Sequence, residues 1–65
     1  MPNMDTDDAR GLSVGDGVEY FDGKQWKWSE VIQPLREAGS HLARETVRVD
    51  TGTYSTEAAP YQLRR

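Results

Sequence analysis

An Asp-Gly pair at positions 22 and 23 separates two short runs of aromatic and β-branched residues, 18–21 and 26–32. Asp-Gly between two such runs is a strong hairpin signal, because both central residues of the tight turn that it forms have positive φ. In the first run, strand alternation places Val18 and Tyr20 on one face and the residues between and after them on the other. The sequence therefore predicts a β-hairpin with Asp22-Gly23 at its tip.

Alternation in the second run leaves one residue unexplained. Trp26 and Trp28 share a face, and Glu30 falls beside them. A small barrel needs at least one large ring in its core, so we expect one of the two tryptophans to be its anchor. A bulge near Trp28-Ser29 would re-aim the strand and take the glutamate off the buried face.

The rest of the chain predicts further short strands. Residues 46–50 alternate β-branched side chains with charges and end at Thr51-Gly52, residues 53–57 form a plausible fourth strand, and residues 61–63 follow Pro60 as a closing strand. Residues 35–45 fit a helix by their apolar spacing, but Gly39-Ser40 at their centre favours a hairpin. Five short strands in about fifty residues predict a small all-β barrel rather than a sandwich.

Length and composition limit the organisation and the partners. The chain has 65 residues, no cysteine and a net charge of −3. We expect residues 1–11 to form a disordered acidic tail and residues 12–65 to form the barrel. No apolar run approaches the roughly 20 residues of a membrane helix, so we expect no membrane partner and a cytoplasmic protein. The missing basic excess makes nucleic acid an unlikely partner.

Four motifs follow one another between Val14 and about Leu63, namely Gly15-Asp16-x-Val18, Asp22-Gly23 followed by Trp26-x-x-Ser29-x-Val31, Val47-x-Val49-Asp50-x-Gly52, and Tyr54. In this order they resemble the motifs of the Tudor, agenet and chromo-like group of SH3-like barrels. The fold that this resemblance implies is a five-stranded SH3-like, Tudor-like barrel.

Members of that group that bind methylated lysine or arginine use a cage of aromatic rings. Carried over to this sequence, the cage positions are Tyr20, Trp26 and Tyr54, while Val49 stands at the fourth position. With that ring missing, we expect a shallow apolar groove, with Phe21 beside it, that binds a protein or peptide partner. The alternative is that these rings are barrel core or a homo-oligomer surface, which would make the chain a structural or assembly protein.

We expect no enzymatic activity, cofactor or metal site. His41 is the only histidine, and without cysteine a zinc site would need several carboxylates. None of the serines lies in a nucleophile motif, and no glycine-rich phosphate loop follows a strand. The sequence therefore predicts a non-catalytic interaction module.

Overall fold

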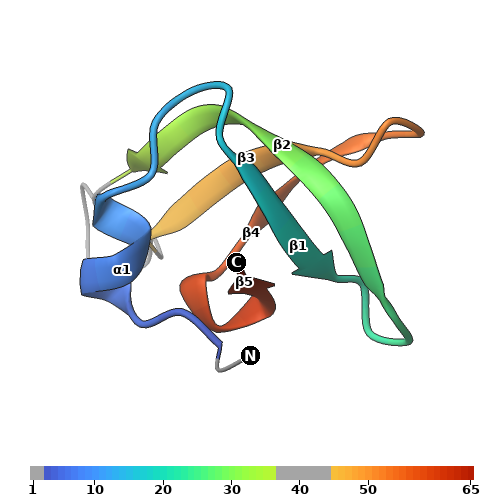
Figure 1. Cartoon of the computed structure of the whole chain (residues 1–65), viewed down its shortest axis with the longest axis horizontal. Helices are drawn as coiled ribbons and strands as arrows, with labels where there is room; N and C mark the ends of the chain where they lie inside the picture. The colour runs from blue at the N-terminus through green and yellow to red at the C-terminus, as the bar shows by residue number, and fades with distance from the viewer. Residues whose placement is uncertain (1–2, 37–44) are drawn as a thin grey trace.

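The computed structural model describes residues 3–36 and 45–65 and shows one five-stranded antiparallel sheet with a short helix against it (Figure 1). The strand order is β4-β3-β2-β1-β5. The elements are α1 (Thr6–Arg10), β1 (Gly17–Phe21), β2 (Trp26–Arg36), β3 (Thr46–Asp50), β4 (Ser55–Ala58), the 3₁₀ helix η1 (Pro60–Gln62) and β5 (Leu63–Arg64). The all-β prediction is confirmed. Strands β1 to β4 form a meander, and η1 returns the chain so that β5 pairs with β1, which leaves β4 and β5 as the edges of an open sheet.

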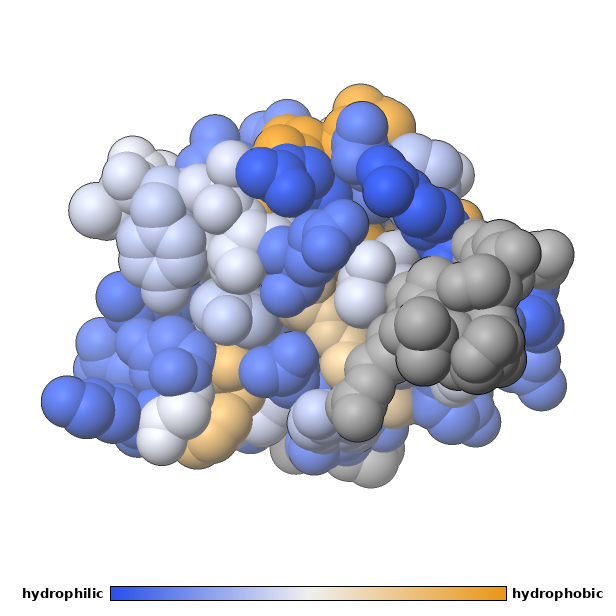
Figure 2. Space-filling view, turned by 180° about the vertical axis from the view of Figure 1, so that it is seen from behind, coloured by the Kyte–Doolittle hydropathy of each residue, from blue (hydrophilic) through white to orange (hydrophobic). Residues whose placement is uncertain are grey.

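The core lies on one face of the bent sheet and is built mainly from aliphatic residues, with Tyr20 as its one aromatic ring among the described residues. Strand alternation directs every second side chain inward, as the repeating buried positions of β1 and β3 show. On the face seen in Figure 2, hydrophobic residues reach the surface only in small, separate patches. The buried hydrophobic residues are Met4, Ala9, Leu12, Val18, Tyr20, Val31, Val47, Val49, Ala58 and Leu63.

The expected tryptophan anchor is wrong. Ser29 and Val31 are the residues of β2 that face the core, so alternation turns Trp26, Trp28 and Glu30 outward together. The pairing of β1 with this part of β2 is uninterrupted, and no bulge is present at Trp28-Ser29. Glu30 lies beside the tryptophans because all three belong to the outer face.

The expected disorder of residues 1–11 is also wrong over residues 3–11, and residues 1–2 lie outside the described part. Asp5 caps α1 by accepting a hydrogen bond from the N–H of Asp8, in a reciprocal capping box. The backbone N–H of Met4 donates to the carbonyl of Leu63 at 2.8 Å, which covers the free edge of β5. The segment is ordered because Met4 and Ala9 complete the core.

Two hairpin turns use the same construction. Asp22 Oδ1 accepts from the N–H groups of Lys24 and Gln25, and Thr51 Oγ1 accepts from the two equivalent N–H groups of the β3–β4 turn. Each turn then places glycine at its first central position, with φ of 103° at Gly23 and 94° at Gly52. Positive φ at Gly23 is confirmed, but the turn is centred on Gly23-Lys24, one residue later than predicted, since Asp22 N–H donates to the Gln25 carbonyl.

The remaining strand predictions agree with the structure in part. The strand at 46–50 is confirmed, the fourth strand begins at Ser55 instead of Thr53, and only Leu63 of the predicted closing strand 61–63 is in β5. Leu35 and Arg36 belong to β2, and β2 pairs with β3 in antiparallel register, as the hairpin alternative requires. The turn expected at 38–40 lies outside the described residues.

Candidate functional site

The outer face of β1 and β2 carries three rings, which we call the outer aromatic face: Phe21, Trp26 and Trp28. Phe21 and Trp26 are paired across the two strands, with their ring centroids 5.2 Å apart. The guanidinium of Arg64, from β5, lies 4.1 Å from the Trp26 ring centroid and also binds Glu19 Oε2 at 3.2 Å. Trp26 is therefore held between an aromatic neighbour and a cation of the same chain.

Trp28 is the exposed member of the outer aromatic face. Its exposed fraction is 71%, the largest among the large hydrophobic side chains of the described residues. The ring lies against Gly17 of β1, where a Cβ atom would overlap the indole Cζ2 and Cη2 atoms. The absence of a side chain at Gly17 thus allows the Trp28 ring to pack closely against the backbone of β1.

The groove expected at Tyr20, Trp26 and Tyr54 does not form, because the rings at these three positions do not share one face. Tyr20 is buried, 8% exposed, on the inner face of β1, and its neighbour Phe21 places Trp26 on the opposite face of the same hairpin. Tyr54 lies at the β3–β4 turn, where its ring contacts Lys27, the cross-strand partner of Tyr20. Residues adjacent in a strand point to opposite faces, so the Tyr20 and Trp26 rings cannot enclose one ligand.

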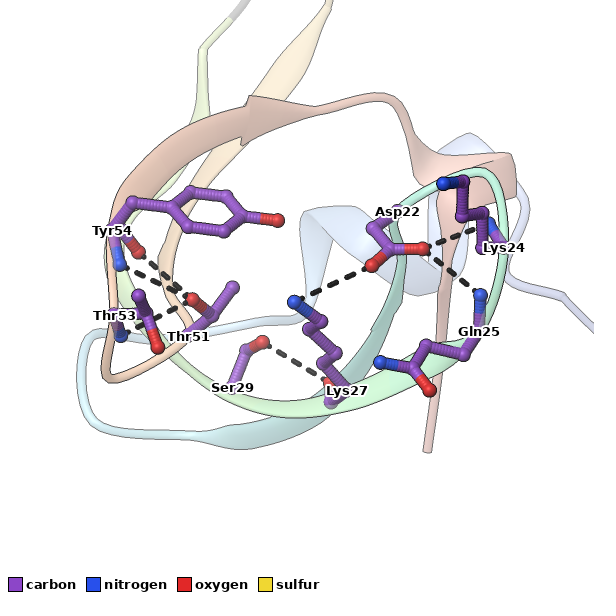
Figure 3. Close-up of polar contacts among 8 residues, drawn as sticks. All are labelled: Asp22, Lys24, Gln25, Lys27, Ser29, Thr51, Thr53 and Tyr54. Atoms are coloured by element: carbon purple, nitrogen blue, oxygen red, sulfur yellow. Dashed lines mark hydrogen bonds and ion pairs between the residues drawn. The ribbon is translucent and has the colours of Figure 1, made fainter.

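The ring of Tyr54 faces a cation supplied by the chain itself (Figure 3). Lys27 Nζ lies 5.4 Å from the Tyr54 ring centroid and 3.4 Å from Asp22 Oδ2. The backbone N–H groups of Gln25 and Lys24, and then Lys27, hold the pKa of Asp22 below its ordinary value. Lys27 therefore already places an ammonium group of the same chain against the Tyr54 ring.

A hollow of about 220 Å³ opens next to Trp28, where β2 meets the β3–β4 turn. Its lining includes the Trp28 ring and two acidic residues, Glu30 and Asp50, with Thr51 and Gly52 at the turn. The sequence analysis identified none of these as site residues. The alternation of β2 does place Trp28 and Glu30 on the same face. Because one of the two tryptophans was expected to be buried, Trp28 and Glu30 were not predicted to form a site.

The described residues contain neither a group of side chains that could hold a metal ion nor a membrane-spanning helix. Within residues 3–36 and 45–65, no three histidine, aspartate or glutamate side chains are grouped so as to hold a metal ion. None of the helices in this part of the chain has the length and apolar character needed to cross a membrane. The chain matches no protein-family model, and comparison with curated proteins and with solved structures gives no match.

Proposed function

We propose that this chain is a non-catalytic interaction module with an SH3-like barrel fold, which binds a protein or peptide partner through the outer aromatic face. A four-stranded meander, followed by a 3₁₀ turn and a fifth strand paired with the first, supports that fold. The single observation that carries the function is the exposure of Trp28 at 71%, in a structure whose described core contains only one aromatic ring, that of Tyr20. Tryptophan is strongly enriched among the residues that dominate binding energy at interfaces.

The geometry favours an extended peptide over a methylated ammonium group. The outer aromatic face is spread over two strands, and Trp26 is already covered by Arg64 on this face. Two of the rings at the cage positions, Tyr20 and Trp26, are on opposite faces of the hairpin. A surface of this kind can contact every second side chain of an extended or loop segment of the partner.

The experiment is a selection of peptides from a random-sequence library on the immobilised chain, followed by titration of the isotope-labelled protein. We expect the selected peptides to shift the amide resonances of β1 and β2 and to lose binding to the Trp28→Ser variant. Tyr61→Ser is the matched control, because Tyr61 is a similarly exposed ring, at 61%, located in η1. Peptides that bind Trp28→Ser as well as the wild type, or no enriched peptides at all, would contradict the proposal.

The same variant addresses the structural or assembly alternative. Sedimentation of the wild-type chain at high concentration measures self-association directly. A stable oligomer that becomes monomeric in Trp28→Ser would assign the outer aromatic face to assembly, whereas a monomer agrees with an interaction module.

A further inference from the structure

Two carboxylates are opposite each other beside Trp28, and neither forms an ion pair within residues 3–36 and 45–65. Glu30 of β2 and Asp50 of β3 are direct cross-strand partners, and both are exposed. Like charges directly opposite on neighbouring strands destabilise a sheet. In the described part of the chain, the ion pairs involve other residues, and neither carboxylate is within 4.0 Å of a lysine or arginine nitrogen.

The arginines on this face bind other partners. Arg64 is held by Trp26 and by Glu19, the residue of β1 opposite Trp28. Arg48 of β3 is two residues from Asp50 and shares its face, and its guanidinium donates at 3.3 Å to the hydroxyl of Ser55, the cross-strand partner of Asp50. Neither arginine lines the hollow beside Trp28, whose charged lining residues are Glu30 and Asp50.

The contacts of Arg64 within the same chain indicate which ligand suits the hollow beside Trp28. Around Arg64, a tryptophan ring and a carboxylate of the outer face hold one guanidinium, at 4.1 Å from the Trp26 centroid and 3.2 Å from Glu19 Oε2. The hollow offers the same two kinds of group, with Trp28 and Glu30 on one strand instead of two, and adds the carboxylate of Asp50. A guanidinium is suited to the place because it stacks on an aromatic ring while its planar N–H groups donate to carboxylates.

We propose that Trp28, Glu30 and Asp50 bind an arginine side chain carried by a segment of a partner protein. This inference rests on the proposed function and specifies its partner, a basic segment lying across β2. The charge of the two carboxylates and the exposed face of the indole are both complementary to arginine. Binding places a positive charge between the opposed carboxylates and so offsets the repulsion that the free protein carries.

The probes are four pools of short peptides, random except for a central residue fixed as arginine, lysine, leucine or glutamate. We expect the arginine pool to bind most tightly, and the double variant Glu30→Gln, Asp50→Asn to weaken that binding by about tenfold, as the loss of charge-assisted hydrogen bonds implies. Binding of the leucine pool should be unchanged. Glu57→Gln is the matched control, since Glu57 is an exposed carboxylate of β4 opposite Arg48.

Thermal unfolding of the same variants separates binding from folding. Because Glu30→Gln removes a like-charge pair, it should leave the melting temperature unchanged or raise it while weakening the arginine pool. An arginine pool that binds no more tightly than the leucine pool, or a double variant with wild-type affinity, would overturn the inference. If the leucine pool still binds in a Trp28-dependent way, the proposed function stands without it; if no pool binds, both are wrong.

Discussion

Replacing Met4 with alanine tests whether the N-terminal segment is part of the folded unit. Met4 is 6% exposed and belongs to the same buried cluster as Leu63, to which its N–H donates at 2.8 Å. The substitution keeps that backbone bond and removes the side chain. Large-to-small changes of this kind cost about 2–5 kcal/mol in a core, and a site close to the chain end can relax, so we expect about 2 kcal/mol.

For a chain of 65 residues this is a large fraction of the stability, which should total about 3–10 kcal/mol. The melting temperature should fall by about 8–16 °C, measured by far-ultraviolet circular dichroism, with urea unfolding as the second assay. Asp7→Ala is the control in the same segment, because its ion pair with Arg10 is exposed and contributes little. If Met4→Ala unfolds at the same temperature as Asp7→Ala, the N-terminal segment does not pack on the sheet.

Other substitutions test the turns, the core and the outer face. Gly23→Ala should cost about 1–2 kcal/mol in urea unfolding because φ is 103°, while Gly11→Ala, at φ −82°, should be neutral or stabilising; equal effects would contradict the assigned turn. Because the pKa of Asp22 is lowered in the fold, its charge stabilises the protein above the unfolded pKa, and that contribution is lost as pH falls through the folded pKa. Asp22→Asn should therefore be less stable than the wild type at neutral pH and lose the difference in acid; a constant difference would show that the charge is not responsible. Trp28→Ala should change the free energy of unfolding by less than about 0.5 kcal/mol, whereas Leu63→Ala should cost about 2–5 kcal/mol, and the reverse order would place the indole in the core.

Local pattern was sufficient to predict the first hairpin and β3, and it located β4 and β5 only in part. Alternation of β-branched and charged residues defined β3 at Thr46–Asp50, and the Asp22-Gly23 pair located the first hairpin. These features depend on residues that are close in sequence. The helix α1 has a local signal too, since Asp5 and Asp8 form its capping box. The acidic composition of residues 1–11 led to a prediction of disorder instead.

The orientation of the hairpin could not be predicted in this way. Alternation separates Trp26 and Trp28 from Ser29 and Val31, but it does not say which set faces inward. Ring size favoured the tryptophans, whereas in the structure Tyr20 supplies the only buried ring among the described residues, and Ser29 fits opposite Val18. Which face of the hairpin is buried is decided by packing against strands that are distant in the sequence.

The candidate site depends even more on long-range register. Glu30 faces Asp50 only in the observed pairing of β2 with β3, and that pairing shifts twice around Gln33 and Pro34. Such irregularities change which residues are opposite one another. No local feature of the sequence places the two carboxylates together.

The exposure of Trp28 is measured most directly by acrylamide quenching of single-tryptophan variants. Trp26→Phe leaves Trp28 as the only fluorophore, and Trp28→Phe leaves Trp26, since the chain has two tryptophans. With Trp28 at 71% exposure and Trp26 covered by Phe21 and Arg64, Trp28 should be quenched markedly more strongly than Trp26. Protection of Trp28 equal to or greater than that of Trp26 would contradict an outer aromatic face available for a partner.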